Sequence, residues 1–187
     1  TWDKMLDIIM YWSAKGVDGF RCDMVELVPP QFFKWLIAKT KETYPDIIFI
    51  AEVYKKDLYN EYIRNVGFDL LYDKSGLYDT LRSVVDKGIN DNGMPVELWQ
   101  SATGITRNWQ FLGDLQPYML NFLENHDEQR IASQFFAGDA VKGFPAMAVS
   151  TLISASPVMV YAGQELGEKA HEAEGFSGFD GRTTIFD

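Results

Sequence analysis

Residues 47–52 read IIFIAE, a continuous apolar run of strand length that ends in a glutamate. An unbroken apolar run is typical of a parallel strand that is buried on both faces, because a half-solvated strand alternates between apolar and polar residues. A second short strand is predicted at 17–22, and the segment between the two, opened by Pro29-Pro30, has its apolar residues at helical spacing. A strand, a helix and a strand in this order predict parallel pairing, since the helix supplies the crossover that parallel neighbours need.

The same alternation continues in both directions along the chain. Residues 2–15 carry an amphipathic helical pattern, and residues 119–124 and 158–161 are predicted as strands on either side of a helix at 144–154. The intervening region is less regular, with helical patterns at 58–66, 77–85 and 96–102 and a weaker strand pattern at 68–72. The prediction is an α/β fold with about five parallel strand-helix units.

Five units are fewer than a closed (β/α)8 barrel contains. Such a barrel needs eight units and roughly 250 residues, whereas this chain has 187. Half a barrel would leave open sheet edges, which proteins normally avoid. We therefore expect residues 1–187 to be the C-terminal portion of a partial TIM barrel, with the missing strands supplied by upstream chain.

Composition excludes several classes of partner. The net charge is -10, and no stretch concentrates lysine and arginine, so nucleic acid is not an expected partner. No run of eighteen apolar residues suggests a membrane span. The single cysteine, Cys22, cannot form an internal disulfide, and its place in an apolar strand predicts a buried, inert thiol rather than a metal ligand.

Three predicted strands end at acidic residues: Asp23, Glu52 and Asp127. In a parallel barrel the carboxyl ends of all strands open on one face, so acids that are distant in sequence can share a pocket. Side-chain alternation places Arg21 on the same side as Asp23, where its guanidinium would keep the carboxylate ionised. Glu52 follows the most apolar run in the chain, and apolar surroundings would favour its protonated form. One ionised and one protonated acid are what retaining glycoside hydrolysis requires.

The motifs around these acids resemble the α-amylase family (glycoside hydrolase family 13). Residues 16–23, GVDGFRCD, resemble that family's fourth-strand segment, and residues 49–52, FIAE, its fifth. Residues 122–127, FLENHD, together with Arg130, are similar to the seventh-strand segment, and residues 157–165 to the eighth strand and its loop. The motifs occur in the family's order and cover nearly the whole chain.

The resemblance implies a role for each matching residue. Asp23 is the expected nucleophile, Glu52 the acid/base and Asp127 the residue that stabilises the transition state. Arg21 is the expected partner of Asp23, and His126 the expected donor to a sugar hydroxyl. Tyr54 is a candidate for stacking on a sugar ring, with core packing as the alternative.

Two departures from the family pattern bear on binding. Many members carry a Lys-His pair a few residues after the nucleophile, on the side of the leaving group, whereas this chain has Glu26 and Leu27. Glu26 is therefore a candidate substrate-binding residue, and the substrate preference on that side is expected to differ from that of those members. The family's third-strand segment, with its calcium ligand, and the domain inserted after it lie upstream. No cofactor or metal is expected for this chain itself, and calcium is left to the full-length protein.

The expected function is retaining hydrolysis of α-glucosidic bonds in starch-like α-glucans or maltooligosaccharides. Within the same family, α-glucosidase and glucan transferase activities are alternatives, because the loops that select chain length and acceptor are partly missing. A barrel that binds carbohydrate without turnover is a further alternative, although all three acids are present. The isolated chain is expected to be inactive, since part of the pocket is missing.

Overall fold

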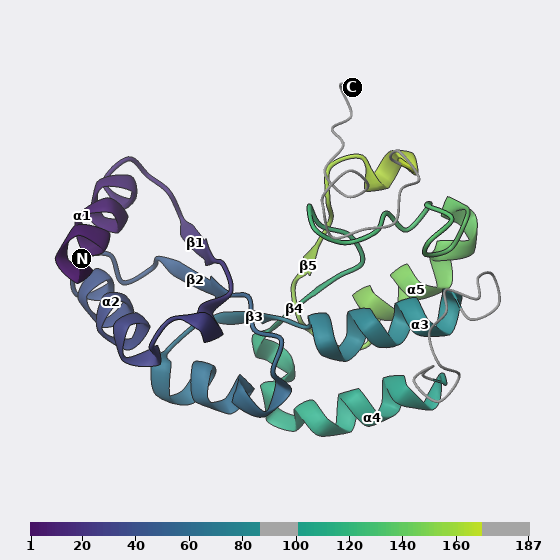
Figure 1. The fold of residues 1–187 in the computed structure, drawn as a ribbon, viewed down its shortest axis with the longest axis horizontal. Helices are drawn as coiled ribbons and strands as arrows, with labels where there is room; N and C mark the ends of the chain where they lie inside the picture. The colour runs from purple at the N-terminus through teal and green to yellow at the C-terminus, as the bar shows by residue number, and fades with distance from the viewer. Residues whose placement is uncertain (87–100, 170–187) are drawn as a thin grey trace. The chain divides into compact units, whose positions relative to one another are not determined.

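The computed structural model describes residues 1–86 and 101–169, and the chain divides into two compact units (Figure 1). The first unit comprises Thr1–Tyr72, and the second begins at Asp73. Within the described part of the chain, every helix is too short or too polar to cross a membrane.

The first unit is a three-stranded parallel sheet with its helices packed beside it. Strand β1 pairs with β2, with Gly19 opposite Ile48, and β2 pairs with β3, with Ile50 opposite Leu70. Helix α1 packs on α2, which also contacts η3. The elements are α1 Trp2–Ser13, β1 Gly19–Cys22, η1 Val25–Leu27, α2 Pro30–Thr43, β2 Ile48–Ala51, η2 Lys56–Leu58, the π-helix η3 Glu61–Val66 and β3 Leu70–Tyr72.

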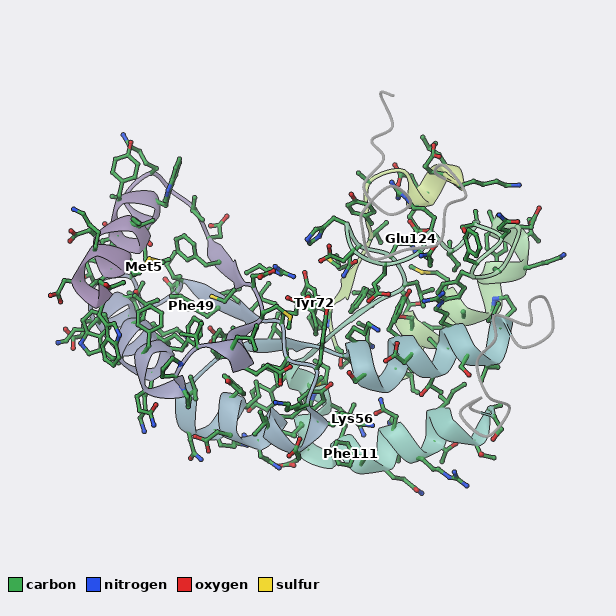
Figure 2. The ribbon with its side chains drawn as sticks, viewed as in Figure 1. Met5, Phe49, Lys56, Tyr72, Phe111 and Glu124 are labelled. Carbon is green, nitrogen blue, oxygen red and sulfur yellow. The ribbon has the colours of Figure 1, made fainter. Side chains whose placement is uncertain are left out.

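The core of this unit is built around Phe49, which lies on β2 (Figure 2). Its ring contacts Phe20 of β1 and Phe68, and Phe68 in turn contacts Phe33 of α2. Phe49 is completely buried, whereas Ile48 is 43% exposed. The prediction that β2 is buried on both faces is therefore wrong, because the helices of this unit cover one face of its sheet.

The second unit contains two parallel strands and the helices around them. Asn121 of β4 lies opposite Val158 of β5, and helix α3 contacts both α4 and α5. The elements are the π-helix η4 Lys74–Tyr78, α3 Asp79–Asp86, α4 Thr103–Leu112, η6 Gly113–Tyr118, β4 Met119–Phe122, α5 Ala140–Leu152, β5 Val158–Met159 and η7 Gln164–Leu166.

The order of elements agrees with the prediction, including the weak strand at 68–72, but several details differ. Helix α5 begins at Ala140 rather than at residue 144, because the side chain of Asp139 accepts a hydrogen bond of 2.8 Å from the Val141 amide and caps the helix. Strand β5 is only partly buried rather than fully so. Of the helix predicted at 96–102, only 101 and 102 are among the described residues, and they are not helical; helix α4 at Thr103–Leu112 was not predicted.

Candidate active site

Parallel pairing of β1 with β2 brings the first two acids together. Cys22 and Ala51 are partners at the carboxyl ends of their strands, so Asp23 and Glu52 follow side by side. The Glu52 amide continues the ladder by donating a hydrogen bond of 3.0 Å to the Cys22 carbonyl. Two residues 29 positions apart in sequence thus leave the same edge of one small sheet, as the strand pattern predicted.

Arg21 connects the two carboxylates. Its Nη1 donates a hydrogen bond of 2.6 Å to Oδ1 of Asp23, and its Nη2 lies 2.9 Å from Oε2 of Glu52. The guanidinium also lies over the ring of Tyr72, 5.5 Å from its centroid. Burial by itself lowers the pKa of Arg21, but the hydrogen bond to Asp23 and the charge of Glu52 outweigh it and raise that pKa above its ordinary value. Arg21 is therefore a permanent cation between the two acids.

The surroundings of Glu52 are polar, contrary to the expectation of an apolar setting. Its side chain is 2% exposed, yet Oε1 accepts a hydrogen bond of 2.8 Å from the Tyr54 hydroxyl. Oε2 accepts a hydrogen bond of 3.0 Å from the Met24 amide and lies beside Arg21. The apolar run before Glu52 misled the prediction, because the residues that surround a strand end come from neighbouring loops.

Asp23 differs from Glu52 in its exposure. The side chain of Asp23 is 71% exposed, whereas that of Glu52 is almost fully enclosed. An accessible carboxylate held at one oxygen by Arg21 can approach a substrate atom, while an enclosed one is fixed in a single orientation. The two acids therefore have distinct surroundings, as a division of chemical labour requires.

Tyr54 and Glu26 also lie at this edge of the first unit. The hydroxyl of Tyr54 is directed at Glu52, so this side chain belongs to the carboxylate's immediate surroundings. The carboxylate of Glu26 faces the Tyr54 and Lys55 amides, whose nitrogens lie 3.3 and 3.4 Å away. Glu26 therefore supports the loop that follows β2, which the sequence did not indicate.

Cys22 is only partly buried, whereas the sequence predicted a buried thiol. Burial raises the pKa of its thiol to about 11, although the nearby charge of Arg21 acts in the opposite direction. Thiols with so high a pKa are poor nucleophiles at neutral pH.

Among residues 1–86 and 101–169 there is no group of three or more His, Cys, Asp or Glu side chains that could hold a metal ion.

In the second unit, Asn125 shapes the turn that carries His126 and Asp127. Its side-chain oxygen accepts hydrogen bonds of 2.8 Å from the amides of both Asp127 and Glu128, which closes a tight turn directly after β4. Nε2 of His126 lies 3.1 Å from Oδ2 of Asp127, and the Asp127 side chain is 11% exposed. The side chains of His126 and Asp127 are therefore in direct contact.

A buried ion pair anchors the same loop, and sequence reasoning did not assign it. Glu124, labelled in Figure 2, accepts hydrogen bonds from Nη1 of Arg130 at 2.9 Å and from the Ile131 amide at 2.8 Å. Nη1 of Arg130 also donates to the Ala162 carbonyl at 2.8 Å, and its guanidinium stacks over Tyr161 at 4.3 Å. The loop after β4 is therefore tied to the segment after β5. The opposite charges at the two ends of residues 124–130, ENHDEQR, are the sequence feature that could have indicated this ion pair.

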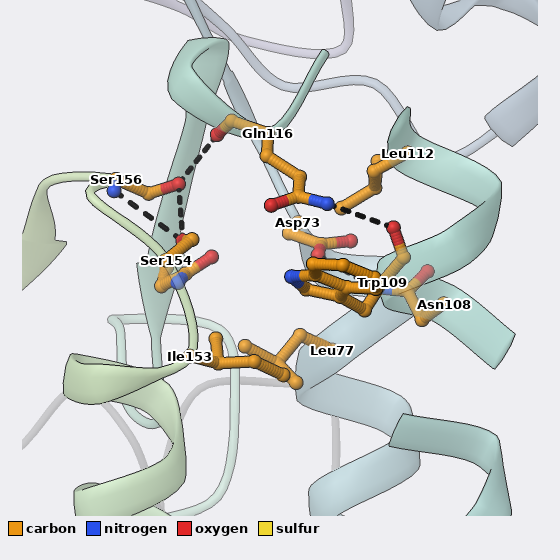
Figure 3. Close-up of a pocket in the computed structure, with 10 residues that line it drawn as sticks. Asp73, Leu77, Asn108, Trp109, Leu112, Gln116, Ile153, Ser154 and Ser156 are labelled. Carbon is orange, nitrogen blue, oxygen red and sulfur yellow. Dashed lines mark hydrogen bonds between the residues drawn. The ribbon is translucent and has the colours of Figure 1, made fainter. Parts of the chain in front are cut away.

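Two hollows lie away from these acids. In the second unit, Asp73, Asn108 and Trp109 line a pocket with about 10 Å³ of open space, closed on one side by a hydrogen bond of 3.0 Å from Gln116 to the Trp109 carbonyl (Figure 3). That space is at the limit for one water molecule and is too small for a sugar. A larger hollow of about 340 Å³ in the first unit lies at the amino ends of β1 and β2, opposite to Asp23 and Glu52.

The chain is similar to known proteins over nearly its whole length. The family model described as "Alpha amylase, catalytic domain" matches residues 2–183. Among curated proteins, the α-1,4-glucan:maltose-1-phosphate maltosyltransferase of Rhodospirillum rubrum is 35% identical over 71 residues, which are 38% of this chain and 10% of that protein. The corresponding protein of Corynebacterium pseudotuberculosis is 37% identical over 65 residues, 35% of this chain and 10% of that protein. The chain thus matches about a tenth of these relatives' length.

Solved structures agree in fold. The cyclic α-maltosyl-(1→6)-maltose hydrolase of Arthrobacter globiformis matches 95% of this chain and 38% of its own, with a TM-score of 0.73 and 23% identity. The Nostoc punctiforme debranching enzyme matches 89% and 37%, with a TM-score of 0.72 and 20% identity. These matches, with parallel strands in each unit, confirm the predicted α/β fold as part of a (β/α)8 barrel.

Proposed function

This chain belongs to the α-amylase catalytic-domain family, and on that basis we propose that it supplies the catalytic acids of a retaining enzyme that cleaves α-glucosidic bonds in α-glucans or maltooligosaccharides. The observation that carries the proposal is the position of Arg21 between Asp23 and Glu52. A single guanidinium that contacts both carboxylates is consistent with the separation of about 5–5.5 Å that a retaining mechanism needs.

In the proposed reaction, Asp23 is the nucleophile. Its carboxylate attacks the anomeric carbon and forms a glycosyl ester, while the bond from that carbon to the leaving oxygen breaks. Glu52 gives its proton to the leaving oxygen in the same step. In the second step Glu52 takes a proton from water, and the resulting hydroxide oxygen replaces Asp23 at the anomeric carbon. The exposure of Asp23 and the enclosure of Glu52 suit these two roles.

Asp127 and His126 are the proposed contributors from the second unit. A carboxylate that faces the reacting sugar stabilises positive charge on the oxocarbenium-like transition state. His126 is proposed to donate a hydrogen bond to a sugar hydroxyl, with Asp127 beside it at 3.1 Å to orient the ring. Glu26 and Tyr54 are proposed to line the substrate side of the loop after β2, where Tyr54 acts through its contact with Glu52.

The remaining strands of the barrel are proposed to come from chain upstream of Thr1. The family's solved structures matched above are about two and a half times longer than the part that this chain covers. We expect residues 1–187 alone to have no measurable activity, because part of the pocket lies outside them. Robust hydrolysis of maltooligosaccharides by the isolated chain would contradict this.

The proposal is tested in the full-length protein with Asp23→Asn and Glu52→Gln. Each change removes a charge or a transferable proton with little change in shape, and general acid-base catalysis alone contributes about 10²–10⁴-fold in rate. Both variants should lose at least that factor in kcat/KM on maltooligosaccharides, whereas Asp57→Asn, on η2, should match the unmodified protein. Activity of Asp23→Asn near the unmodified rate would show that the nucleophile is assigned wrongly.

Transfer to a second sugar, rather than to water, is the alternative reaction. It is favoured by the similarity to proteins named as maltosyltransferases. Both reactions share the first step and differ only in the hydroxyl that Glu52 deprotonates. Product analysis with and without an added maltooligosaccharide acceptor separates them: hydrolysis gives reducing ends in proportion to bonds cleaved, whereas transfer gives longer chains without them.

A further inference from the structure

Met24 has a backbone conformation that its residue type rarely adopts. Its φ is 40° and its ψ is 49°, in the left-handed region, and it is the one non-glycine residue with a positive φ among residues 1–86 and 101–169. Left-handed backbone is unfavourable for residues with a Cβ, and such outliers persist where the surrounding structure holds them. Met24 directly follows Asp23 and precedes η1.

This conformation changes where the backbone amides after β1 are directed. In a regular parallel ladder, the Glu52 amide would bond to the Cys22 carbonyl and the Glu52 carbonyl would accept from the Met24 amide. The first bond is present at 3.0 Å, but it is the Val25 amide that donates to the Glu52 carbonyl, at 3.2 Å. The turn at Met24 thus releases its own amide from the ladder, and that amide donates to Oε2 of Glu52 at 3.0 Å.

We propose that Met24 is a positioning residue for the acid/base Glu52, acting through its left-handed backbone rather than through its side chain. This inference rests on the proposed function. The Met24 amide and Arg21 fix Oε2, while the Tyr54 hydroxyl fixes Oε1, so the carboxyl group is oriented from both ends. Asp23, which directly precedes this turn, has a side chain that is 71% exposed.

The test compares Met24→Ile with Met24→Leu in the full-length protein. The two side chains are isomers, but only isoleucine is branched at Cβ, and β-branched residues are the least tolerant of a positive φ. Isoleucine should therefore pull the backbone away from this conformation and withdraw the amide from Glu52. Leucine should tolerate a positive φ about as well as methionine does.

The readout is the dependence of kcat/KM on the leaving group. Cleavage of a maltooligosaccharide requires proton donation by Glu52, whereas α-maltosyl fluoride releases fluoride, a leaving group that needs little protonation. The ratio kcat/KM reports only the first step, in which the leaving group departs. For Met24→Ile, kcat/KM should fall about tenfold on the oligosaccharide and less than about twofold on the fluoride. A tenfold fall is only part of the rate enhancement that general acid-base catalysis provides. Met24→Leu should stay within about twofold of the unmodified protein on both.

Three outcomes would overturn the proposal. Equal losses for isoleucine and leucine would assign the effect to the side chain, and equal losses on both substrates would assign it to general disruption. If Met24→Ile does not fold, replacement of Met24 by its α-hydroxy acid, which exchanges the amide for an ester, decides the matter, and an unchanged ratio between the substrates would refute the role. Failure of the proposed function is recognised separately, because Asp23→Asn and Glu52→Gln would then remain active.

Discussion

The guanidinium of Arg130 lies 2.9 Å from the carboxylate of Glu124, and neither side chain is exposed to solvent. Two charges taken out of water are tolerated because each satisfies the other and because Arg130 also donates to the Ala162 carbonyl. The pair therefore joins the loop that carries Asp127 to the segment after β5.

Removing one partner of this pair should be costly. Arg130→Met leaves a buried carboxylate without its cation, which is expected to lower the free energy of unfolding by about 3–5 kcal/mol at neutral pH. Adding Glu124→Gln should recover a substantial part of the loss. Urea unfolding of the full-length protein measures both values, with Lys4→Met, in the exposed pair Lys4–Asp7, as a control of little effect. Additive losses in the double variant would show that the two side chains are not coupled.

The pH dependence of stability should carry the signature of Glu124. Burial is the largest influence on its pKa and raises it, although the hydrogen bonds from Arg130 and Ile131 partly counteract burial. The folded protein thus holds this proton more tightly than the unfolded chain. The resulting stabilisation is complete below the ordinary glutamate pKa of about 4.3 and is lost as the pH rises through the raised pKa.

The measurement is the difference in unfolding free energy between the unmodified protein and Glu124→Gln as a function of pH. As the pH rises from the ordinary glutamate pKa through the raised pKa of Glu124, the unfolding free energy of the unmodified protein should fall relative to that of the variant. Above the raised pKa, the difference between the two should become constant. A difference that is constant, or that changes in the opposite direction, would contradict the raised pKa.

Arg21→Lys should reduce activity although the positive charge is kept. A lysine ammonium cannot reproduce the planar fork that contacts both Asp23 and Glu52. Loss of one charge-assisted hydrogen bond is worth about 1.5–3 kcal/mol, which corresponds to a roughly ten- to hundredfold fall in kcat/KM. The measurement uses maltooligosaccharides and the control Arg64→Lys, on η3. An unchanged rate would mean that charge alone suffices.

Cys22 should resist alkylation in the folded protein. With a pKa of about 11, roughly one thiol in a thousand is ionised at pH 8, and only the thiolate reacts. Labelling of the Cys22 peptide by iodoacetamide should be at least about a hundredfold slower than in the urea-unfolded protein, and should rise about tenfold per pH unit. Comparable labelling rates in the folded and unfolded protein would show that the thiol is accessible and unperturbed.

The strands were predictable because their apolar runs are local in sequence. Residues 47–52 and 119–124 were recognisable as strands from the side chains alone, and the helix between β1 and β2 implied their parallel pairing. The start of α5 was misjudged because its cap is a single hydrogen bond that the Val141 amide donates to the Asp139 carboxylate, a short-range contact that the apolar pattern does not include. The sequence patterns thus located the helices and strands more accurately than the residues at which they begin and end.

That Arg21, Asp23 and Glu52 lie together was predictable, but the groups around Glu52 were not. Asp23, Glu52 and Arg21 could be grouped because strand ends converge and side chains alternate. The polar partners of Glu52 could not be foreseen, since Tyr54 lies on the following loop and the Met24 amide depends on a positive φ that methionine does not signal. The anchoring role of Glu26 was missed for the same reason.

The order of acids, the arginine two residues before Asp23 and the alternation of strands and helices were fixed by the chain itself, because each depends on spacing that any reader of the sequence can count. The tertiary structure alone decided which groups surround Glu52, how far Asp23 is exposed and which amide turns toward a carboxylate. These depend on backbone angles and on contacts between loops that are remote in sequence, and spacing along the chain does not encode such contacts.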